Sequence, residues 1–340
     1  MAVKVLIVDD SLLFREALAR SLADDASIVV VGKASDAFDA EKKIAELNPD
    51  VVTLDVEMPK MNGIDFLRKQ MAIKPIPVVV VTASPLSAFE ALNAGAVEFI
   101  KKPLVKGADE LKAFSEKMRH TIKIASIARV RTKPLTAIHA NLSGYVVNSA
   151  RSRNLIIALG ASTGGTDALQ TVVQDLPVNT PGIVITQHMP AGFTKMYAER
   201  LNRICKMTVK EAEDGDRIET GKIIVAAGGL QMRVYKDTNG FYIKSQPGEK
   251  VSGHCPSVDA LFDSVAAAAG KNVIAAILTG MGSDGAKGLK KLKDLGAYTI
   301  GQDKESCVVY GMPMVAFNIG AVIEQAPLSE IPKIILDKCK

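Results

Sequence analysis

The chain has 340 residues, of which 48% are hydrophobic and 23% charged, and its formal net charge is +5 at pH 7. This length is enough for two domains of ordinary size, each with an apolar core of its own. No run of about 18 apolar residues occurs and the first apolar stretch stops at Asp9, so we expect no secretory signal and no membrane insertion, and predict a cytoplasmic protein.

The first third of the chain alternates short β-branched runs with amphipathic ones, from residue 3 to about 106. Five of the β-branched runs predict strands: VKVLIV, SIVVVG, DVVTLD, PVVVVTAS and VEFIKK. The amphipathic segments between them predict crossover helices, and this alternation is typical of a doubly wound parallel sheet. With a last helix at about 108–124, we predict a first domain over residues 1–124.

Residues 125–152 lose this periodicity and are predicted to be an interdomain linker. The excess positive charge lies here and in the preceding helix, since residues 107–152 contain eight Lys and Arg against three Asp and Glu. The segment has neither the interleaved aromatic residues of a stacking surface nor the helix pair of a DNA reader. We therefore expect no nucleic-acid partner.

A second α/β alternation predicts a domain over residues 153–340. Strands are predicted at LIIALG, GIVITQH, 207–211, NVIAAILTG and YTIG, and helices at 165–175, 192–203, 257–269 and 285–295. The interruption GKIIVAAGGLQMRVYKDTNGFYIKSQ predicts an inserted hairpin with a turn at Asn239 and Gly240. The fold class is thus α/β, with a flavodoxin-like and then a Rossmann-like parallel-sheet domain. All four cysteines lie in the second domain without C-x-x-C spacing and are expected to be reduced thiols.

Polar residues follow the predicted strands of the first domain. Asp9 and Asp10 come after the first strand and Asp55 after the third, and the carboxyl ends of parallel strands form one crevice. Such convergent oxygens suit Mg²⁺. Thr82 and Lys102 end the next two strands, and a hydroxyl and an ammonium would offset the charge of a phosphorylated aspartate. A single Asp at a strand end is usually just solvated, but five related residues predict a phosphorylation site.

These residues lie in the motifs LIVDDS, LDVEMPKMNG, VTAS and EFIKKP, through which the first domain resembles the receiver domain of bacterial two-component response regulators. The resemblance implies that Asp55 accepts a phosphoryl group from a histidine kinase. It also implies Mg²⁺ bound by Asp10, Asp55 and the backbone carbonyl of Glu57, with Asp9 supporting the site. The residues that would contact the phosphoryl group or repack on activation are Thr82, Lys102 and Phe99.

The second domain opens with NLIIALGASTGGTDALQTVV, a strand, a glycine-rich turn and a helix, with Ser162 at the turn. A hydroxyl in this position commonly caps the helix, although Thr163 can do the same. Such a turn can also bind phosphate, but its glycines do not fit G-x-G-x-x-G, no Lys-Ser/Thr follows, and the next strand ends in Gln187 and His188 instead of an acid. The third alternative is a nucleophile, which requires a base.

Of the four histidines, His188 ends the strand that follows the Ser162 turn. His120, on the last helix of the first domain, and His139, in the linker, are expected to be solvated. In a parallel sheet His188 shares an edge with Ser162, where a general base must lie, and Asp284 in LTGMGSDGA would fix the imidazole tautomer. The order Ser, His, Asp differs from that of α/β-hydrolases, and GASTGG is not G-x-S-x-G, so we predict another kind of serine hydrolase.

Together, GASTGG, QHMP, HCPSVD and LTGMGSDGA resemble the catalytic domain of the chemotaxis receptor methylesterases, from residue 154 to about 337. The resemblance implies that Ser162 is the nucleophile, His188 the base and Asp284 the orienting acid. The Met281 N–H and the turn around Thr163 would hold the oxyanion. The implied reaction is hydrolysis of glutamate γ-methyl esters on chemoreceptor helices, with receptor glutamine deamidation as a second activity, and no cofactor for the hydrolysis.

The resemblance also implies control and partners. An unphosphorylated receiver would cover the hydrolase cleft, and phosphorylation at Asp55 would loosen that contact. The implied partners are methyl-accepting chemoreceptors and the chemotaxis histidine kinase, and we expect a monomer. Arg is common in the family where Cys255 stands, and if that side chain grips an acidic receptor helix, the affinity for receptor is expected to differ here. His254 is expected either to line the cleft or simply to precede a helix capped by Ser257.

The residues alone leave three rival functions open. A nucleotide-binding output domain would bind its ligand at GASTGG and TGMGSDGA without a reactive serine. A DNA-binding regulator would carry a C-terminal helix-turn-helix of about 60 residues, whereas the second domain is an α/β domain of about 190 residues. A scaffold that lacks catalysis would have no need of the Ser, His and Asp that this chain retains.

Overall fold

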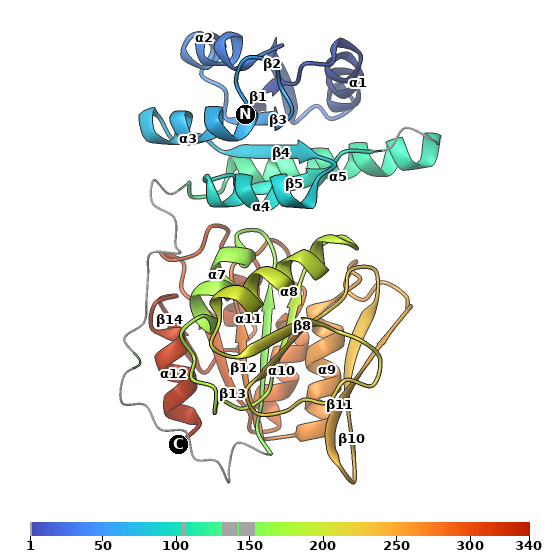
Figure 1. Ribbon diagram of the computed structural model, residues 1–340, viewed down its shortest axis with the longest axis vertical. Helices are drawn as coiled ribbons and strands as arrows, with labels where there is room; N and C mark the ends of the chain where they lie inside the picture. Colours follow the sequence, from blue (N-terminus) through green and yellow to red (C-terminus); the bar gives the residue numbers. More distant parts are fainter. Residues whose placement is uncertain (1, 104–106, 131–141, 143–153) are drawn as a thin grey trace. The chain divides into compact units, whose positions relative to one another are not determined.

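The computed structural model describes residues 2–103, 107–130, 142 and 154–340 (Figure 1). The chain divides into two compact units, Met1–Pro134 and Leu135–Lys340. The division lies within the predicted linker, most of which, including His139, is outside the described residues. Each unit has a parallel sheet of its own.

The first unit is built on a five-stranded sheet with strand order β2-β1-β3-β4-β5, in which all neighbours are parallel. The strands are β1 (Val3–Val8), β2 (Ile28–Ala34), β3 (Val51–Asp55), β4 (Val78–Thr82) and β5 (Glu98–Lys101). The helices are α1 (Leu12–Ala23), α2 (Ala37–Leu47), α3 (Gly63–Ile73), α4 (Pro85–Asn93) and α5 (Ala108–Ser126). The predicted doubly wound sheet is confirmed, and its last helix ends shortly after the expected residue 124.

The strands of this sheet are nearly continuous runs of Val, Ile and Leu because helices cover both faces of a parallel sheet. Both β3 and β4 are buried along their whole length. Side-chain caps start α1, α2, α3 and α4; the capping residues are Ser11, Asp36, Asn62 and Ser84. The β1–α1, β3–α3 and β4–α4 loops, with their polar residues, therefore lie at the carboxyl edge of the sheet.

The second unit contains a seven-stranded sheet in the order β14-β13-β12-β6-β7-β9-β8, again with parallel neighbours. Its strands are β6 (Ile156–Ala161), β7 (Ile183–Gln187), β8 (Thr208–Glu211), β9 (Lys222–Val225), β12 (Val273–Ile277), β13 (Tyr298–Gln302) and β14 (Glu324–Ala326). Its helices are α7 (Gly165–Val173), α8 (Phe193–Ile204), α9 (Val258–Ala269), α10 (Ala286–Asp294), α11 (Met312–Asn318) and α12 (Ile331–Lys338). Sequence periodicity predicted no element after residue 301, where the structure adds α11, β14 and α12.

The inserted hairpin consists of β10 (Gln231–Asp237) and β11 (Gly240–Gln246). Its turn residues are Thr238 and Asn239, one position before the predicted turn, because Asp237 pairs with Gly240. The start of the segment that we assigned to the insertion, KIIV, is instead β9 and lies in the main sheet between β7 and β8. Three consecutive buried residues in β9 suit a strand that is covered on both faces.

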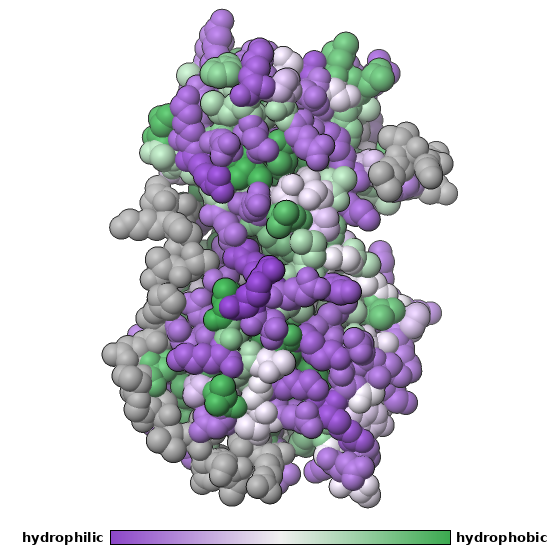
Figure 2. All heavy atoms as spheres, viewed as in Figure 1, coloured by the Kyte–Doolittle hydropathy of each residue, from purple (hydrophilic) through white to green (hydrophobic). Residues whose placement is uncertain are grey.

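One hydrophobic core joins the inner face of the hairpin to α9, α10, α11 and the sheet, while α7 packs on β6 and against α12. The surface visible in Figure 2 is mostly hydrophilic, with scattered hydrophobic residues between the polar ones. Within the described residues, no helix has both the length and the apolar character that crossing a membrane requires.

Candidate functional site

Lys102 connects two buried carboxylates at the carboxyl edge of the first sheet. Asp9 follows β1, Asp55 ends β3, and both side chains are almost fully buried. The Nζ atom of Lys102 donates to Oδ2 of Asp9 at 2.8 Å and to Oδ2 of Asp55 at 2.7 Å. Burial raises the pKa of Asp9 above its ordinary value, and the hydrogen bond from Lys102 opposes this rise. The structure thus brings together three residues that the sequence placed at three strand ends.

Asp10 completes a group of three acids. Carboxylate oxygens of Asp9, Asp10 and Asp55 lie within 4.8 Å of one another, and Asp10 faces solvent. Hard divalent cations prefer oxygen ligands in such a cluster, so this donor set fits Mg²⁺. The amide of Glu57 donates to Oδ1 of Asp55 at 3.4 Å. This places Glu57 next to the group, while the role of its carbonyl as a ligand stays a prediction.

Thr82 and Phe99 lie on β4 and β5, the two strands beyond β3. Thr82 is buried, its Oγ1 accepts from the Ser84 amide at 3.1 Å, and its carbonyl accepts from the Lys102 amide at 3.0 Å. The buried ring of Phe99 lies 6.5 Å from that of Phe89 on α4. Thr82 is therefore bonded both to Lys102 and to Ser84, the N-cap of α4, which is the helix against which Phe99 packs.

Ser162 directly follows β6 at the carboxyl edge of the second sheet, and its side chain is partly exposed. Its amide donates to the carbonyl of Thr279 at 3.0 Å. The N-cap of the next helix, α7, is Gly164, and no side chain caps this helix. Neither Ser162 nor Thr163 is therefore a helix cap, which removes the simplest structural role for the serine.

Two glycines, one in the Ser162 turn and one after β12, allow the close packing around Ser162. Gly164 has a φ of +74°, in the left-handed region, and a Cβ there would lie 2.6 Å from Val308. Gly280, after β12, lies directly against the serine, because a Cβ at this position would be 2.7 Å from Cβ of Ser162. This close approach brings the start of the loop after β12, which also contains Met281 and Asp284, against the serine.

His188 follows β7, the strand that pairs with β6. Its amide donates to the carbonyl of Ala161 at 3.2 Å, which places it on the same sheet edge as Ser162. Its Nε2 atom lies 2.7 Å from Oδ2 of Asp284, and the two side chains are only 9% and 1% exposed. The predicted Ser, His and Asp thus come from the ends of three adjacent strands, β6, β7 and β12.

The N-terminus of α9 holds Asp284. Its carboxylate accepts from Oγ of Ser257 at 2.8 Å, from the Val258 amide at 2.7 Å and from the Asp259 amide at 2.9 Å. Burial opposes ionisation of Asp284, but the hydrogen bonds from His188 and from these amides outweigh it and hold its pKa below the ordinary value. A helix N-terminus also favours an anion. Asp284 is therefore an ionised and fixed acceptor for His188.

The orientation of the His188 ring distinguishes its two nitrogens. Because an ionised carboxylate only accepts hydrogen bonds, the Nε2 atom that faces Asp284 carries the proton and Nδ1 has the free lone pair. Nδ1 is buried and forms no hydrogen bond within the described part of the chain. The ring of His254 stacks on the same imidazole, with centroids 3.7 Å apart. A basic nitrogen without a partner, on the sheet edge that also holds a partly exposed serine, suits a general base.

Two backbone amides near Ser162 are available to a ligand. Across residues 154–340, the amides of Thr163 and Met281 donate no hydrogen bond. The carbonyl of Thr163 accepts from Oγ1 of Thr279 at 3.0 Å, which fixes the turn. Unpaired amides next to a candidate nucleophile suit the binding of a developing oxyanion.

Known families match both units. The family model described as CheB methylesterase matches residues 157–335, and the one described as response regulator receiver domain matches residues 5–115. The chain belongs to the CheB methylesterase family. It carries a response regulator receiver domain before its CheB methylesterase domain.

Curated relatives match along nearly the whole chain. The protein-glutamate methylesterase/protein-glutamine glutaminase 2 of Syntrophomonas wolfei is 50% identical over 331 residues, which cover 97% of this chain and 95% of the relative. The protein-glutamate methylesterase/protein-glutamine glutaminase of Salmonella typhimurium is 42% identical over 341 residues, 99% of this chain and 97% of the relative. The crystal structure of the Thermotoga maritima CheB methylesterase catalytic domain is 37% identical, has a TM-score of 0.53 and covers 54% of this chain and 98% of that structure.

Three residues of the CheB methylesterase domain support the site without having been predicted to do so. Gln187 donates from Nε2 to the carbonyl of Ser162 at 2.9 Å. Thr279 bonds to both Ser162 and Thr163. Ser257 caps α9 as expected and also donates to Asp284. The sequence offered one signal for Ser257, its predicted position as the cap of a helix. It offered one signal for Gln187, its place directly before His188.

The sequence also drew attention to His120 and to the four cysteines. His120 is exposed on α5 in the receiver unit. All four cysteines are free thiols, and burial raises the pKa of Cys255 above its ordinary value. Cys255 directly follows His254, so it adjoins the histidine that stacks on His188.

Proposed function

We propose that this protein hydrolyses glutamate γ-methyl esters on chemoreceptor helices, deamidates receptor glutamines, and is activated by phosphorylation at Asp55. The observation that carries the proposal is the placement of His188. Its Nε2 faces Asp284, and its buried Nδ1 is left without a partner on the sheet edge that holds Ser162. The relatives' names record the same pair of activities.

The first half of the reaction acylates the serine. Oγ of Ser162 attacks the ester carbonyl carbon while Nδ1 of His188 takes the hydroxyl proton. The amides of Thr163 and Met281 bind the negative charge that develops on the carbonyl oxygen. Asp284 keeps Nε2 protonated and stabilises the imidazolium. When the C–O bond to the methoxy group breaks, His188 gives its proton to the leaving group, which departs as methanol.

The second half restores the enzyme. Water attacks the glutamyl ester of Ser162 with His188 as the base, and the products are a glutamate carboxylate and the free serine. With a glutamine side chain, the same first step expels ammonia, because His188 protonates the leaving nitrogen. Both substrates therefore give the same product, and the balance requires only water.

The receiver domain would supply control. Asp9, Asp10 and Asp55, with the carbonyl of Glu57, would hold Mg²⁺, which when bound offsets the charge of an incoming phosphoryl group. A phosphoryl group on Asp55 gives Nζ of Lys102, now divided between Asp9 and Asp55, a third anionic acceptor. Movement of Thr82 toward the same group would release space into which Phe99 repacks.

The proposal divides the chain into a receiver domain at 1–124, a linker at 125–152 and a catalytic domain at 153–340. Chemoreceptors are then the substrate and a chemotaxis histidine kinase is the phosphodonor, and a monomeric enzyme meets both in the cytoplasm. Restraint of the catalytic domain by the unphosphorylated receiver makes the response a shift between two states of the chain.

Methanol release from membranes that bear methylated receptors tests the proposal, with and without acetyl phosphate and Mg²⁺. We expect release by the natural chain, an increase with the phosphodonor, and a loss of about 10⁴-fold or more in Ser162→Ala. Ser283→Ala is the matched control, since Ser283 is an exposed serine in the neighbouring Asp284 loop. Undiminished release by a folded Ser162→Ala protein would refute the assignment.

A further inference from the structure

The outer face of the hairpin carries cationic and aromatic side chains that the reaction above does not use. Cross-strand pairing places Arg233 opposite Lys244 and Tyr235 opposite Tyr242. All four are at least partly exposed, whereas the inner face of the same hairpin is buried in the core. These four residues are called the hairpin face below.

Neither cation of the hairpin face pairs with an acid, and Lys244 lies over an aromatic ring instead. The rings of Tyr235 and Tyr242 are 5.8 Å apart, and Nζ of Lys244 lies 5.0 Å from the centroid of Tyr235. Neither Arg233 nor Lys244 forms an ion pair with any described residue. Like charges directly opposite each other destabilise a hairpin. An anion between these two side chains would remove that repulsion, so the face suits a negatively charged ligand.

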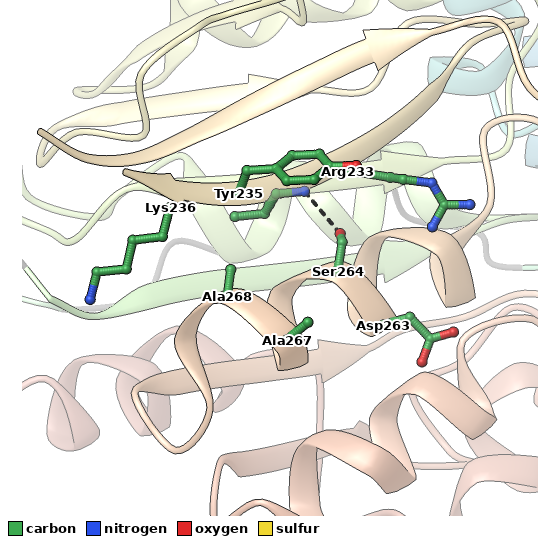
Figure 3. Close-up of a pocket in the computed structure, with 8 residues that line it drawn as sticks. Arg233, Tyr235, Lys236, Asp263, Ser264, Ala267 and Ala268 are labelled. Atoms are coloured by element: carbon green, nitrogen blue, oxygen red, sulfur yellow. Dashed lines mark hydrogen bonds between the residues drawn. The ribbon is translucent and has the colours of Figure 1, made fainter. Parts of the chain in front are cut away.

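A hollow of about 470 Å³ lies on one side of Arg233 and Tyr235, between β10 and α9 (Figure 3). In Figure 3, Arg233 and Lys236 extend from β10 toward opposite ends of this hollow, and Ala267 and Ala268 of α9 lie below them. The small alanine side chains leave the space open. Cationic groups at both ends and an apolar floor suit an elongated segment with acidic side chains.

A second hollow of about 330 Å³ lies on the other side of Arg233 and Tyr235, against residues 247–251. Lys244 and Lys250 line it together with one acid, Glu249. The first hollow also contains one acid, Asp263, which pairs with Lys291 at 3.2 Å. Across both hollows the cationic side chains outnumber the acidic ones, so the surface as a whole attracts anions.

The base of the hairpin is bonded to the candidate catalytic residues. Nε2 of Gln231 donates to the carbonyl of His254 at 2.9 Å, and Oε1 of Gln231 accepts from the Ser257 amide at 3.0 Å. His254 stacks on His188, and Ser257 donates to Asp284. A short chain of direct contacts therefore links the hairpin, where the ligand would bind, to the candidate catalytic histidine.

We propose that the hairpin face, with Lys236 and Lys250 at its ends, docks the acidic receptor segment that flanks the glutamate ester. This inference rests on the proposed function of Ser162. Each turnover replaces a neutral ester by a carboxylate, so a segment with several modification positions becomes more acidic as it is processed. Unpaired cations then bind the carboxylates, while the tyrosine rings cover the methylene groups of the same side chains. The enzyme consequently prefers receptor segments that are already partly hydrolysed.

Two helical peptides, each with a single glutamate γ-methyl ester, test this inference. In one peptide the residues one helical turn before and after the ester are Glu, and in the other they are Gln. The full chain is assayed by methanol release with acetyl phosphate and Mg²⁺, and binding is measured by fluorescence anisotropy with the Ser162→Ala chain. We expect a KM roughly five- to tenfold lower for the Glu-flanked peptide. The double variant Arg233→Gln/Lys244→Gln should give equal KM values for both peptides.

The matched control is Lys271→Gln/Lys333→Gln, which removes two exposed charges before β12 and on α12 and should keep the preference. A preference that persists in Arg233→Gln/Lys244→Gln, or is absent from the natural chain, would overturn the inference. So would a preference seen only with phosphatidylglycerol vesicles, which would assign the face to a membrane surface.

Measurements of stability and binding separate docking from a purely structural role of the two cations. Because Arg233→Gln/Lys244→Gln removes two like charges, its unfolding midpoint should be unchanged or higher than that of the natural chain. A lower midpoint together with a higher KM for both peptides would indicate a structural role and overturn docking. Binding to the Ser162→Ala chain decides the docking question without turnover. If methanol is never released, the proposed function fails while the binding preference is still measured.

Discussion

The ring of His254 lies parallel to the ring of His188, with centroids 3.7 Å apart and an interplanar angle of 8°. Asp284 holds the same imidazole by a hydrogen bond at Nε2. The ring of the candidate base is therefore fixed by a hydrogen bond at one edge and by a stacked ring on one face. The sequence left His254 with two possible roles, and the structure places it in contact with the candidate base, His188.

Removal of this stack should reduce the rate moderately. A stacked aromatic pair contributes about 0.5–1.5 kcal/mol beyond its buried area, so His254→Ala should lower kcat/KM for methanol release by about two- to tenfold. His254→Phe keeps a flat ring and should retain most of the activity. Equal losses in the two variants would show that His254 acts through its nitrogens and not through the stack.

Asp284→Asn should have a much larger effect, because it changes the tautomer of His188. The new NH₂ group no longer accepts the Nε2 proton, so the imidazole is protonated at Nδ1 and cannot take the proton of Ser162. We expect kcat for methanol release to fall about 10³- to 10⁴-fold with little change in KM. Asp337→Asn, at an exposed position on α12, is the control. A loss below about tenfold would exclude Asp284 from this role.

Asp55→Asn should abolish the response to phosphodonor. Asp55 is the carboxylate that Lys102 contacts at 2.7 Å, and an amide in its place cannot form the acyl phosphate. We expect acetyl phosphate with Mg²⁺ to stimulate methanol release by the natural chain and to leave that of Asp55→Asn unchanged. Asp65→Asn, at an exposed aspartate on α3, should respond as the natural chain does. Stimulation of Asp55→Asn would place the phosphoacceptor elsewhere.

The sequence predicted most of the architecture because its parallel strands are long apolar runs bounded by glycine or polar residues. It also predicted that Ser162, His188 and Asp284 meet, since parallel strands end at a common sheet edge. β9 was misplaced because KIIV looks the same in a hairpin as in a buried parallel strand. Its position between β7 and β8 depends on pairing with distant strands, which no local pattern records.

The supporting contacts of the site were not predictable from local sequence. Ser257 was expected only to cap α9, and its bond to Asp284 joins two loops 27 residues apart. The stack between His254 and His188 likewise depends on how a loop before α9 folds over β7. Such contacts follow from tertiary packing, whereas the positions of the candidate nucleophile, base and acid follow from strand order.

A second acid of the catalytic domain, Asp167, has an environment opposite to that of Asp284. It lies in the first turn of α7, and its Oδ1 atom is buried without a hydrogen-bond partner. Burial raises its pKa to about 6, although the charge of Arg200 opposes the rise. Burial therefore favours the neutral form of this carboxyl group more than in an ordinary exposed aspartate.

Asp167 should make the catalytic domain less stable as pH rises. Its pKa of about 6 in the folded chain exceeds the ordinary value of 3.8, so between these values the native state holds a proton that the unfolded state has lost. Stability then falls with rising pH across this window, by about 3 kcal/mol in total. Asp167→Asn removes the charge, so its urea unfolding midpoint should exceed that of the natural chain at pH 8 and match it near pH 4. Asp337→Asn, at an exposed position on α12, should change neither midpoint. Equal stability of Asp167→Asn and the natural chain at pH 8 would show that the buried carboxylate carries no such cost.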